Sequence, residues 1–222
     1  MKEEKFIAPN FIIPFKNPDK EFQEKPSSDL MMFPHASRIL FFGTPSSGKS
    51  TCILNCILHQ NFDRIIVVHN LKNTKEYDML DVEYYTEVPD PDDEELALDP
   101  SIKNLIIFED LYYKCLPKQQ KIWLTDYFTT ISTHSSVSCY ISCQDIFHQV
   151  PTNLRRCCNV FVIFKILDKR NLSNICEILN LDLNDMKFIF NKYLTQPFDN
   201  ITIDTTRPNA KIRKNFTQVL EI

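Results

Sequence analysis

Short apolar runs alternate with amphipathic segments along most of this chain. Runs typical of buried strands cover residues 38–43, 64–69, 105–109, 137–143 and 160–165. Apolar residues recur at helical spacing in residues 49–60, near 72–80, and in 118–131, 170–180 and 183–194, and a short strand is expected at 201–203. Because strands that alternate with helices form parallel sheets covered on both faces, the pattern predicts an α/β protein with a mainly parallel central sheet.

The flanks of this pattern suggest three regions. Residues 1–35 are expected to be a proline-rich N-terminal arm, 36–204 the core, and 205–222 a basic C-terminal tail. Within the core, residues 81–99 contain nine acidic side chains and no lysine or arginine. We interpret that stretch as a solvated surface insertion.

Composition narrows the class of protein. The 222 residues are 43% hydrophobic and 24% charged, which fits one globular domain and excludes collagen-like and low-complexity chains. The net charge of −4 divides unevenly: 14 basic and 22 acidic residues in 1–146 give −8, and 11 and 7 in 147–222 give +4. A mildly basic C-terminal third suits a nucleic-acid contact, although charge alone does not establish one.

The sequence carries no sign of secretion or of a membrane span. No apolar run approaches about 18 residues, and the N-terminus has glutamates and prolines where a signal peptide needs basic and apolar residues. The eight cysteines include no C-x-x-C pair and lie mostly in apolar runs, so we expect buried thiols and not a metal site. These features predict a cytosolic protein.

The two glycines of the chain both lie in one octapeptide, GTPSSGKS, at residues 43–50. It matches the phosphate-binding pattern G-x-x-x-x-G-K-[ST] and stands between a predicted strand and a predicted helix, as that pattern requires. Lys49 is expected to reach the β and γ phosphates, and Ser50 to offer a hydroxyl to Mg²⁺. The predicted nucleotide-binding residues are Gly43, Thr44, Pro45, Ser46, Ser47, Gly48, Lys49, Ser50 and Thr51.

Two carboxylates, Glu109 and Asp110, follow the apolar run 105–108. Next to a phosphate loop, one such carboxylate holds Mg²⁺ and the other polarises the attacking water. The usual order places aspartate first. Glu109 is therefore the expected Mg²⁺ ligand and Asp110 the expected base, with an exchange of these roles left open.

A polar side chain and two arginines complete the candidate site. Gln144 follows the strand 137–143, where ligands bind in parallel α/β sheets, and is a candidate for sensing the γ-phosphate or orienting water. Arg155 and Arg156 precede the strand 160–165, and either is a candidate arginine finger that acts in its own subunit or in a neighbour.

The ordered set GTPSSGKS, LIIFEDL, THSSVSCYISCQD and VPTNLRRCCNVFVIFK resembles the poxvirus-type DNA-packaging ATPases of large DNA viruses and virophages, within the FtsK/HerA superfamily. The likeness spans about residues 36–204, and its more specific part is His134, a strand, Gln144, and then an arginine before an apolar strand. It implies a three-layer α/β/α P-loop fold. It maps Lys49 and Ser50 to phosphate and Mg²⁺, and the other candidates to the roles given above.

The resemblance also implies partners and a place of action. Proteins of this family drive double-stranded DNA into a preformed capsid with ATP, as a ring of subunits whose active sites lie between neighbours. Capsid or vertex proteins are then expected partners, and the host-cell cytoplasm, a viral factory or the virion the expected location. Lys114, Lys118 and Lys121 are candidates for phosphate contacts with DNA, against a solvated helix face. A small-molecule P-loop kinase and a non-catalytic ATP-binding assembly module remain alternatives.

Overall fold

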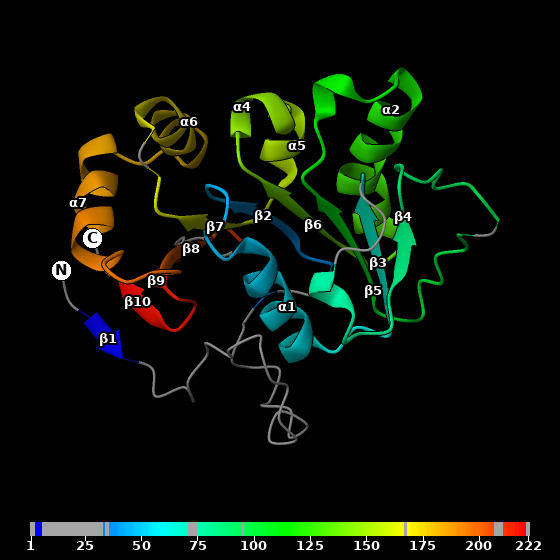
Figure 1. The fold of residues 1–222 in the computed structure, drawn as a ribbon, viewed down its shortest axis with the longest axis horizontal. Helices are drawn as coiled ribbons and strands as arrows, with labels where there is room; N and C mark the ends of the chain where they lie inside the picture. The colour runs from blue at the N-terminus through cyan, green and yellow to red at the C-terminus, as the bar shows by residue number, and fades with distance from the viewer. Residues whose placement is uncertain are drawn as a thin grey trace.

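The centre of the molecule is a sheet built largely from apolar strands. The structure, a computed structural model, describes residues 3–5, 33, 36–70, 75–94, 96–166, 168–206 and 211–220. These residues form one ten-stranded sheet in the order β1-β10-β9-β8-β7-β2-β6-β5-β3-β4. Helices lie on both faces of it (Figure 1).

Six neighbouring strands run parallel to one another. They are β2 (Arg38–Phe42), β3 (Arg64–His69), β4 (Glu83–Tyr85), β5 (Asn104–Glu109), β6 (Val137–Cys143) and β7 (Val160–Phe164). Every residue of β5, β6 and β7 is buried, as expected for strands covered on both faces. Because parallel strands end at the same edge of a sheet, β2, β5 and β6 bring their carboxyl-terminal residues together.

Four antiparallel strands extend the sheet beyond β7. They are β8 (Asn200–Asp204), β9 (Lys211–Lys214), β10 (Gln218–Leu220) and β1 (Glu3–Lys5). The sheet thus continues through residues 211–220, which the sequence placed in a basic tail. The basic charge of Arg213 suggested a solvated tail, but its guanidinium is buried and lies 4.0 Å from the carboxylate of buried Asp204.

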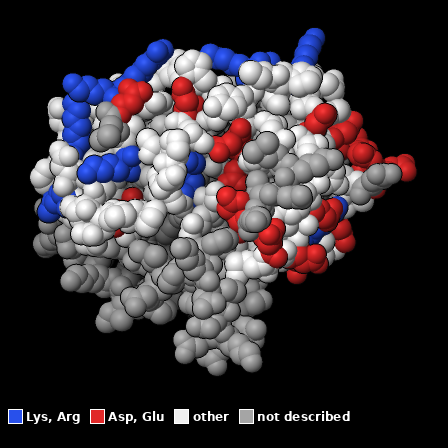
Figure 2. Space-filling view, viewed as in Figure 1, with Lys and Arg blue, Asp and Glu red and all other residues white. Residues whose placement is uncertain are grey.

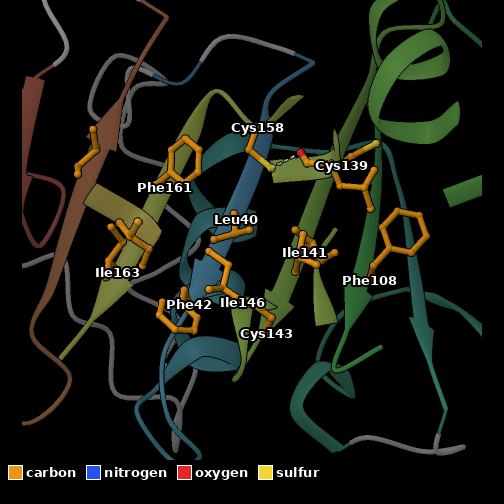
Figure 3. Packing of buried hydrophobic residues seen from close by; sticks show 14 of the residues in the cluster. Leu40, Phe42, Phe108, Cys139, Ile141, Cys143, Ile146, Cys158, Phe161 and Ile163 are labelled. Carbon is orange, nitrogen blue, oxygen red and sulfur yellow. Dashed lines mark hydrogen bonds between the residues drawn. The ribbon is translucent and has the colours of Figure 1, made fainter. Parts of the chain in front are cut away.

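Two helical layers of unequal size enclose the sheet. On one face lies α1 (Lys49–Gln60), and on the other lie α2 (Lys118–Asp126), a π-helical turn (Tyr127–Ile131), α3 (Ser132–His134), α4 (Ile146–Gln149), α5 (Thr152–Cys157), α6 (Lys169–Leu179) and α7 (Leu183–Tyr193). Alternate strand residues serve the two layers: Ile39 and Phe41 pack with α1, and Leu40 and Phe42 with the larger layer. Figure 3 shows Leu40 and Phe42 beside Ile146 of α4 in that second core.

The structure corrects several predicted elements. Residues 75–80 contain one 3₁₀ turn (Lys75–Tyr77) and not the helix expected near 72–80; residues 71–74 lie outside the described residues. The helix expected to end at 131 continues through the π turn to 134, and α4 and α5 have no counterpart among the predictions. α4 follows the carboxyl end of β6 along the chain, and α5 precedes the start of β7.

The acidic segment is more than a solvated insertion. It contributes the edge strand β4, and it buries the side chains of Val88 and Leu96. Arg64 binds it, forming a 2.6 Å ion pair with Glu83 and donating to the carbonyl oxygen of Leu96. A basic side chain on β3 therefore fixes part of the stretch that the charge pattern had assigned to solvent.

The N-terminal arm, the cysteines and the question of a membrane span can also be compared with the structure. Of the expected arm, the structure describes β1 and Phe33, whose ring lies 5.8 Å from that of Phe216; the rest of residues 1–35 is outside the described residues. All eight cysteines are free and six are buried, as expected. In the described part of the chain, no helix has the length and hydropathy needed to cross a bilayer.

Truncating a buried side chain of β9 tests whether this region belongs to the core. Ile212 is 5% exposed, and Ile212→Ala should lower the free energy of unfolding by about 2–4 kcal/mol because it leaves a cavity. Urea denaturation gives the value. Asn191→Ala, at an exposed position of α7, is the control and should stay within about 0.5 kcal/mol of wild type. An Ile212→Ala value as small as the control would mean that residues 211–220 behave as a tail.

Candidate functional site

The octapeptide 43–50 forms the turn from β2 into α1 at the middle of the sheet. β2 lies between β6 and β7, and the Gly43 N–H donates to the Cys143 carbonyl at the end of β6 over 3.3 Å. Inside the loop, Ser47 N–H donates to the Thr44 carbonyl over 3.2 Å. The predicted nucleotide-binding residues 43–51 thus lie together at one strand-to-helix junction, with the N-terminus of α1 directed at the loop.

Both glycines of this loop are required by their surroundings. Gly48 has a φ of 96°, and a Cβ there would lie 2.9 Å from the Phe198 ring. A Cβ on Gly43 would lie 2.5 Å from Ser47 Oγ and 2.8 Å from Phe164 Cβ. A Cβ at either position would force a neighbouring side chain or the loop to shift, and at Gly48 it would also strain the backbone.

Lys49 is held over the loop. Its Nζ donates to the carbonyl oxygens of Gly43 at 3.0 Å and Thr44 at 3.1 Å, and the side chain is 7% exposed. Burial lowers the pKa of Lys49, and the negative charges of Asp110 and Glu109 oppose that shift. A buried ammonium group at this point favours binding of an anion such as a nucleotide phosphate.

Ser50 and Glu109 form the second contact of the site. Ser50 Oγ donates to Glu109 Oε1 over 2.5 Å, and Glu109, at the end of β5, is 4% exposed. Burial raises the pKa of Glu109, whereas the Ser50 and Tyr77 hydroxyls and the nearby His69 oppose that rise. A hydroxyl and a carboxylate oxygen side by side at a phosphate loop fit Mg²⁺, which takes few protein ligands and completes its shell with phosphate oxygens and water.

Asp110 has a different partner from its neighbour Glu109. Gln144 Nε2 donates to Asp110 Oδ2 over 3.0 Å, and the Asp110 backbone has a φ of 48°. The second carboxylate oxygen, Oδ1, is buried and has no protein hydrogen-bond partner. The structure therefore brings Gln144 and Asp110, two of the candidate site residues, into contact and leaves one carboxylate oxygen able to accept a proton from water.

The loop after β6 is held by a residue that sequence analysis missed. Gln149 of α4 is 1% exposed, and its Oε1 accepts from the backbone N–H groups of Gln144 at 2.6 Å and Asp145 at 2.8 Å. Asp145 in turn caps α4 by accepting from the N–H of Phe147 over 2.9 Å. These bonds fix the direction in which Gln144 leaves the strand.

The two candidate arginines differ in exposure. Arg155 is 7% exposed; its Nη2 donates to Thr152 Oγ1 over 2.8 Å, and burial lowers its pKa, while nearby Cys143 at the end of β6 opposes that shift. Arg156 is exposed. Arg155 thus belongs to the interior beside the strand ends, and Arg156 is the arginine of the pair that lies at the surface.

Several residues that the sequence analysis singled out lie away from this site. His134 is exposed at the end of α3, before the amino end of β6 and so across the sheet from the site at the carboxyl end. Lys114 and Lys118 are exposed, and Lys121 donates to the Lys114 carbonyl over 2.9 Å. His69 was missed. It ends β3 in register with Glu109, and its position at a strand end was the signal that could have identified it.

Solved structures share this architecture. The genome packaging NTPase B204 from Sulfolobus turreted icosahedral virus 2, in complex with AMPPCP, is 18% identical over 81% of this chain and 97% of its own, with a TM-score of 0.57. The DNA-packaging ATPase B204 from Sulfolobus Turreted Icosahedral Virus is 15% identical over 80% and 96%, with a TM-score of 0.58. The pCW3 conjugation coupling protein TcpA, with ATPγS, is 14% identical over 94% and 70%, also at 0.58.

At these identities the likeness shows the fold alone. It confirms the expected three-layer α/β/α arrangement with a mainly parallel central sheet. No protein-family model and no curated protein matches the sequence. What this site does must therefore be argued from its own residues.

The buried carboxylate of Glu109 should make the stability of the nucleotide-free protein depend on pH. Its native pKa lies above the ordinary 4.5, so the wild type loses stability as pH rises through that raised pKa. Glu109→Gln cannot ionise. Measured by urea denaturation without Mg²⁺, this variant should gain stability relative to wild type as the pH rises above the ordinary 4.5.

A matched change at a surface acid separates this effect from the general loss of a charge. Glu94 is exposed, and Glu94→Gln removes a carboxylate that is not buried, so it should lack the gain expected of Glu109→Gln. A Glu109→Gln variant that gains no more stability than Glu94→Gln would show that burial does not raise the Glu109 pKa.

Proposed function

We propose that this protein is a Mg²⁺-dependent ATPase that moves double-stranded viral DNA into a preformed capsid. The observation that carries the ATPase part is the meeting of three sets of groups at adjacent strand ends. Lys49 lies over the phosphate loop after β2, the Ser50–Glu109 pair joins α1 to β5, and the Asp110–Gln144 pair joins the ends of β5 and β6. Phosphate binding, metal binding and water orientation are all represented.

The contacts support a division of roles between the two carboxylates. Glu109 shares a hydrogen bond with Ser50, so this pair would hold Mg²⁺, which when bound neutralises charge on the phosphate oxygens. Asp110 has an unpartnered buried oxygen and is held by Gln144, so it would accept the proton of the attacking water. Lys49 would bind the β and γ phosphate oxygens. Although the order of the two acids is reversed, these contacts support Glu109 as the Mg²⁺ ligand and Asp110 as the base.

The packaging part rests on the kind of proteins that share the fold and on the charge distribution. B204 is described as a genome packaging NTPase. In this chain, carboxylates gather at the β4 edge, whereas lysines and arginines lie over α6 and α7 at the opposite side (Figure 2). The exposed cations there include Lys169, Arg170 and Lys192. These cations lie away from the acidic edge, among the exposed carboxylates of Asp168, Glu177, Asp182 and Asp185, and would suit contacts with the phosphates of duplex DNA without base recognition.

Coupling of hydrolysis to movement would follow from assembly. In a homo-oligomeric ring, exposed Arg156 would reach the phosphates bound by a neighbouring subunit, and buried Arg155 would act within its own subunit. Each turnover would then change the contact between subunits and so move a DNA-binding segment. Capsid or vertex proteins would anchor the ring, at the site of virion assembly in the infected cell.

The first test of the proposed function is steady-state ATP hydrolysis with and without linear double-stranded DNA. Wild type should hydrolyse ATP in the presence of Mg²⁺, and DNA should stimulate it. Lys49→Ala and Asp110→Asn should each lower the turnover rate by about a hundredfold or more, because they remove phosphate binding and water activation. The exposed control Lys118→Ala should leave unstimulated turnover unchanged. Phosphate transfer to a small metabolite in place of water would favour the kinase alternative.

Mixing experiments separate the two arginines. Arg156→Ala should lose about a thousandfold in stimulated turnover, and mixing it with Lys49→Ala should restore part of the activity, because each defective subunit supplies what its neighbour lacks. Arg155→Ala mixed with Lys49→Ala should stay inactive, since both changes damage a subunit's own site. Recovery in the Arg155 mixture and none in the Arg156 mixture would reverse the assignment.

A further inference from the structure

An exposed aromatic ring lies against the phosphate loop without a role in the chemistry described above. Phe198 stands in the turn between α7 and β8, and its Cδ1 lies 2.9 Å from the point where a Cβ on Gly48 would be. The ring is thus in contact with the loop backbone immediately before Lys49. At the same time, the Phe198 residue is 58% exposed, more than any other large hydrophobic residue that the structure describes as exposed.

Folding does not account for this placement. The φ of Phe198 is 69°, a left-handed conformation that bulky side chains seldom adopt. A residue that is strained and also leaves most of its apolar surface in water contributes little to the core. Strain of this kind gathers at binding and catalytic sites, where the surrounding structure imposes it.

The turn that carries Phe198 is firmly fixed. The carboxylate of buried Asp199 accepts from the N–H groups of Thr195 at 3.0 Å and Gln196 at 2.8 Å, from Asn215 Nδ2 at 2.9 Å, and from Lys214 Nζ at 3.0 Å. On its other side, the turn is tied to the strand next to the phosphate loop. Lys165, directly after β7, donates to the carbonyl oxygen of Leu194 over 3.4 Å.

We propose that Phe198 is the stacking platform for the purine base of the nucleotide whose phosphates bind the loop. This inference rests on the proposed function, since it requires a nucleotide there. A base carries a flat apolar face, and an exposed aromatic ring held rigidly at the rim of a phosphate site offers a matching surface. Because stacking uses the face of the base and not its edge, it favours purines over pyrimidines and discriminates little between adenine and guanine.

The proposal predicts that Phe198 contributes to the binding of the base and not to that of the phosphates. By calorimetry with Mg²⁺, Phe198→Ala should weaken ADP binding roughly 5- to 100-fold and leave pyrophosphate binding unchanged. Phe198→Tyr should bind ADP like wild type. Phe188→Ala removes a phenylalanine of similar exposure, 54%, on α7 and should change neither affinity.

A second variant protects the test against misfolding of the alanine variant. In Phe198→Trp, the added indole fluorescence should be quenched by ADP but not by pyrophosphate, over the signal of the single native tryptophan, Trp123. Unchanged ADP affinity in Phe198→Ala, or equal losses for ADP and pyrophosphate, would overturn the stacking role. Absence of any ADP binding by wild type would overturn the proposed function along with it.

Discussion

The tight space around the phosphate loop is the constraint on which the rest of the site depends. The loop turns between the Phe164 and Phe198 side chains, and both contact points are occupied by glycine because a Cβ would lie within 2.9 Å of a neighbour. With the backbone fixed in this way, α1 begins at Lys49, and Ser50 reaches Glu109 on β5. A change in the loop path would separate all of these contacts together.

The site concentrates charge in a poorly hydrated place. Lys49 and Glu109 are both more than nine-tenths buried, and burial opposes the charged form of each. Such groups are costly to fold unless partners compensate, and here the compensation comes from loop carbonyls, the Ser50 hydroxyl and the mutual attraction of opposite charges. The positive φ of Asp110 adds to that cost. In the proposed function, a triphosphate with its metal would supply the charges that this arrangement lacks.

The features that the sequence predicted well are those encoded locally. The strands 64–69 and 137–143 have the predicted bounds because short, mostly apolar runs define them, and the phosphate loop is found because its residue order and its flanks agree. The placement of Gln144 and Asp110 at one edge of the sheet was predictable because parallel strands end there, whereas the hydrogen bond between them was found only in the structure. Local pattern was sufficient wherever a residue's role follows from its place at a strand end.

The elements and residues that the sequence did not predict depend mostly on contacts between distant parts of the chain. β4 is mostly exposed, and its pairing with β3 and the ion pair of Glu83 with Arg64 leave no trace in the local pattern. β9 looks like a basic tail until Arg213 is placed beside Asp204. α4 has four residues, too few for a helical period to emerge. The position of Phe198 depends on a turn fixed by Asp199 and on its contact with Gly48, which lies far away along the chain.

In the proposed function, one set of strand ends both binds the nucleotide and activates water. A single-turnover experiment decides whether it does both: the protein, in excess over ATP, is followed for bound nucleotide and released phosphate, with Mg²⁺ or with a chelator. We expect phosphate release from nearly all bound ATP with Mg²⁺, and little release when the metal is removed. Tight Mg²⁺-dependent binding of ATP without phosphate release, with DNA present, would contradict it and identify a nucleotide-binding assembly module.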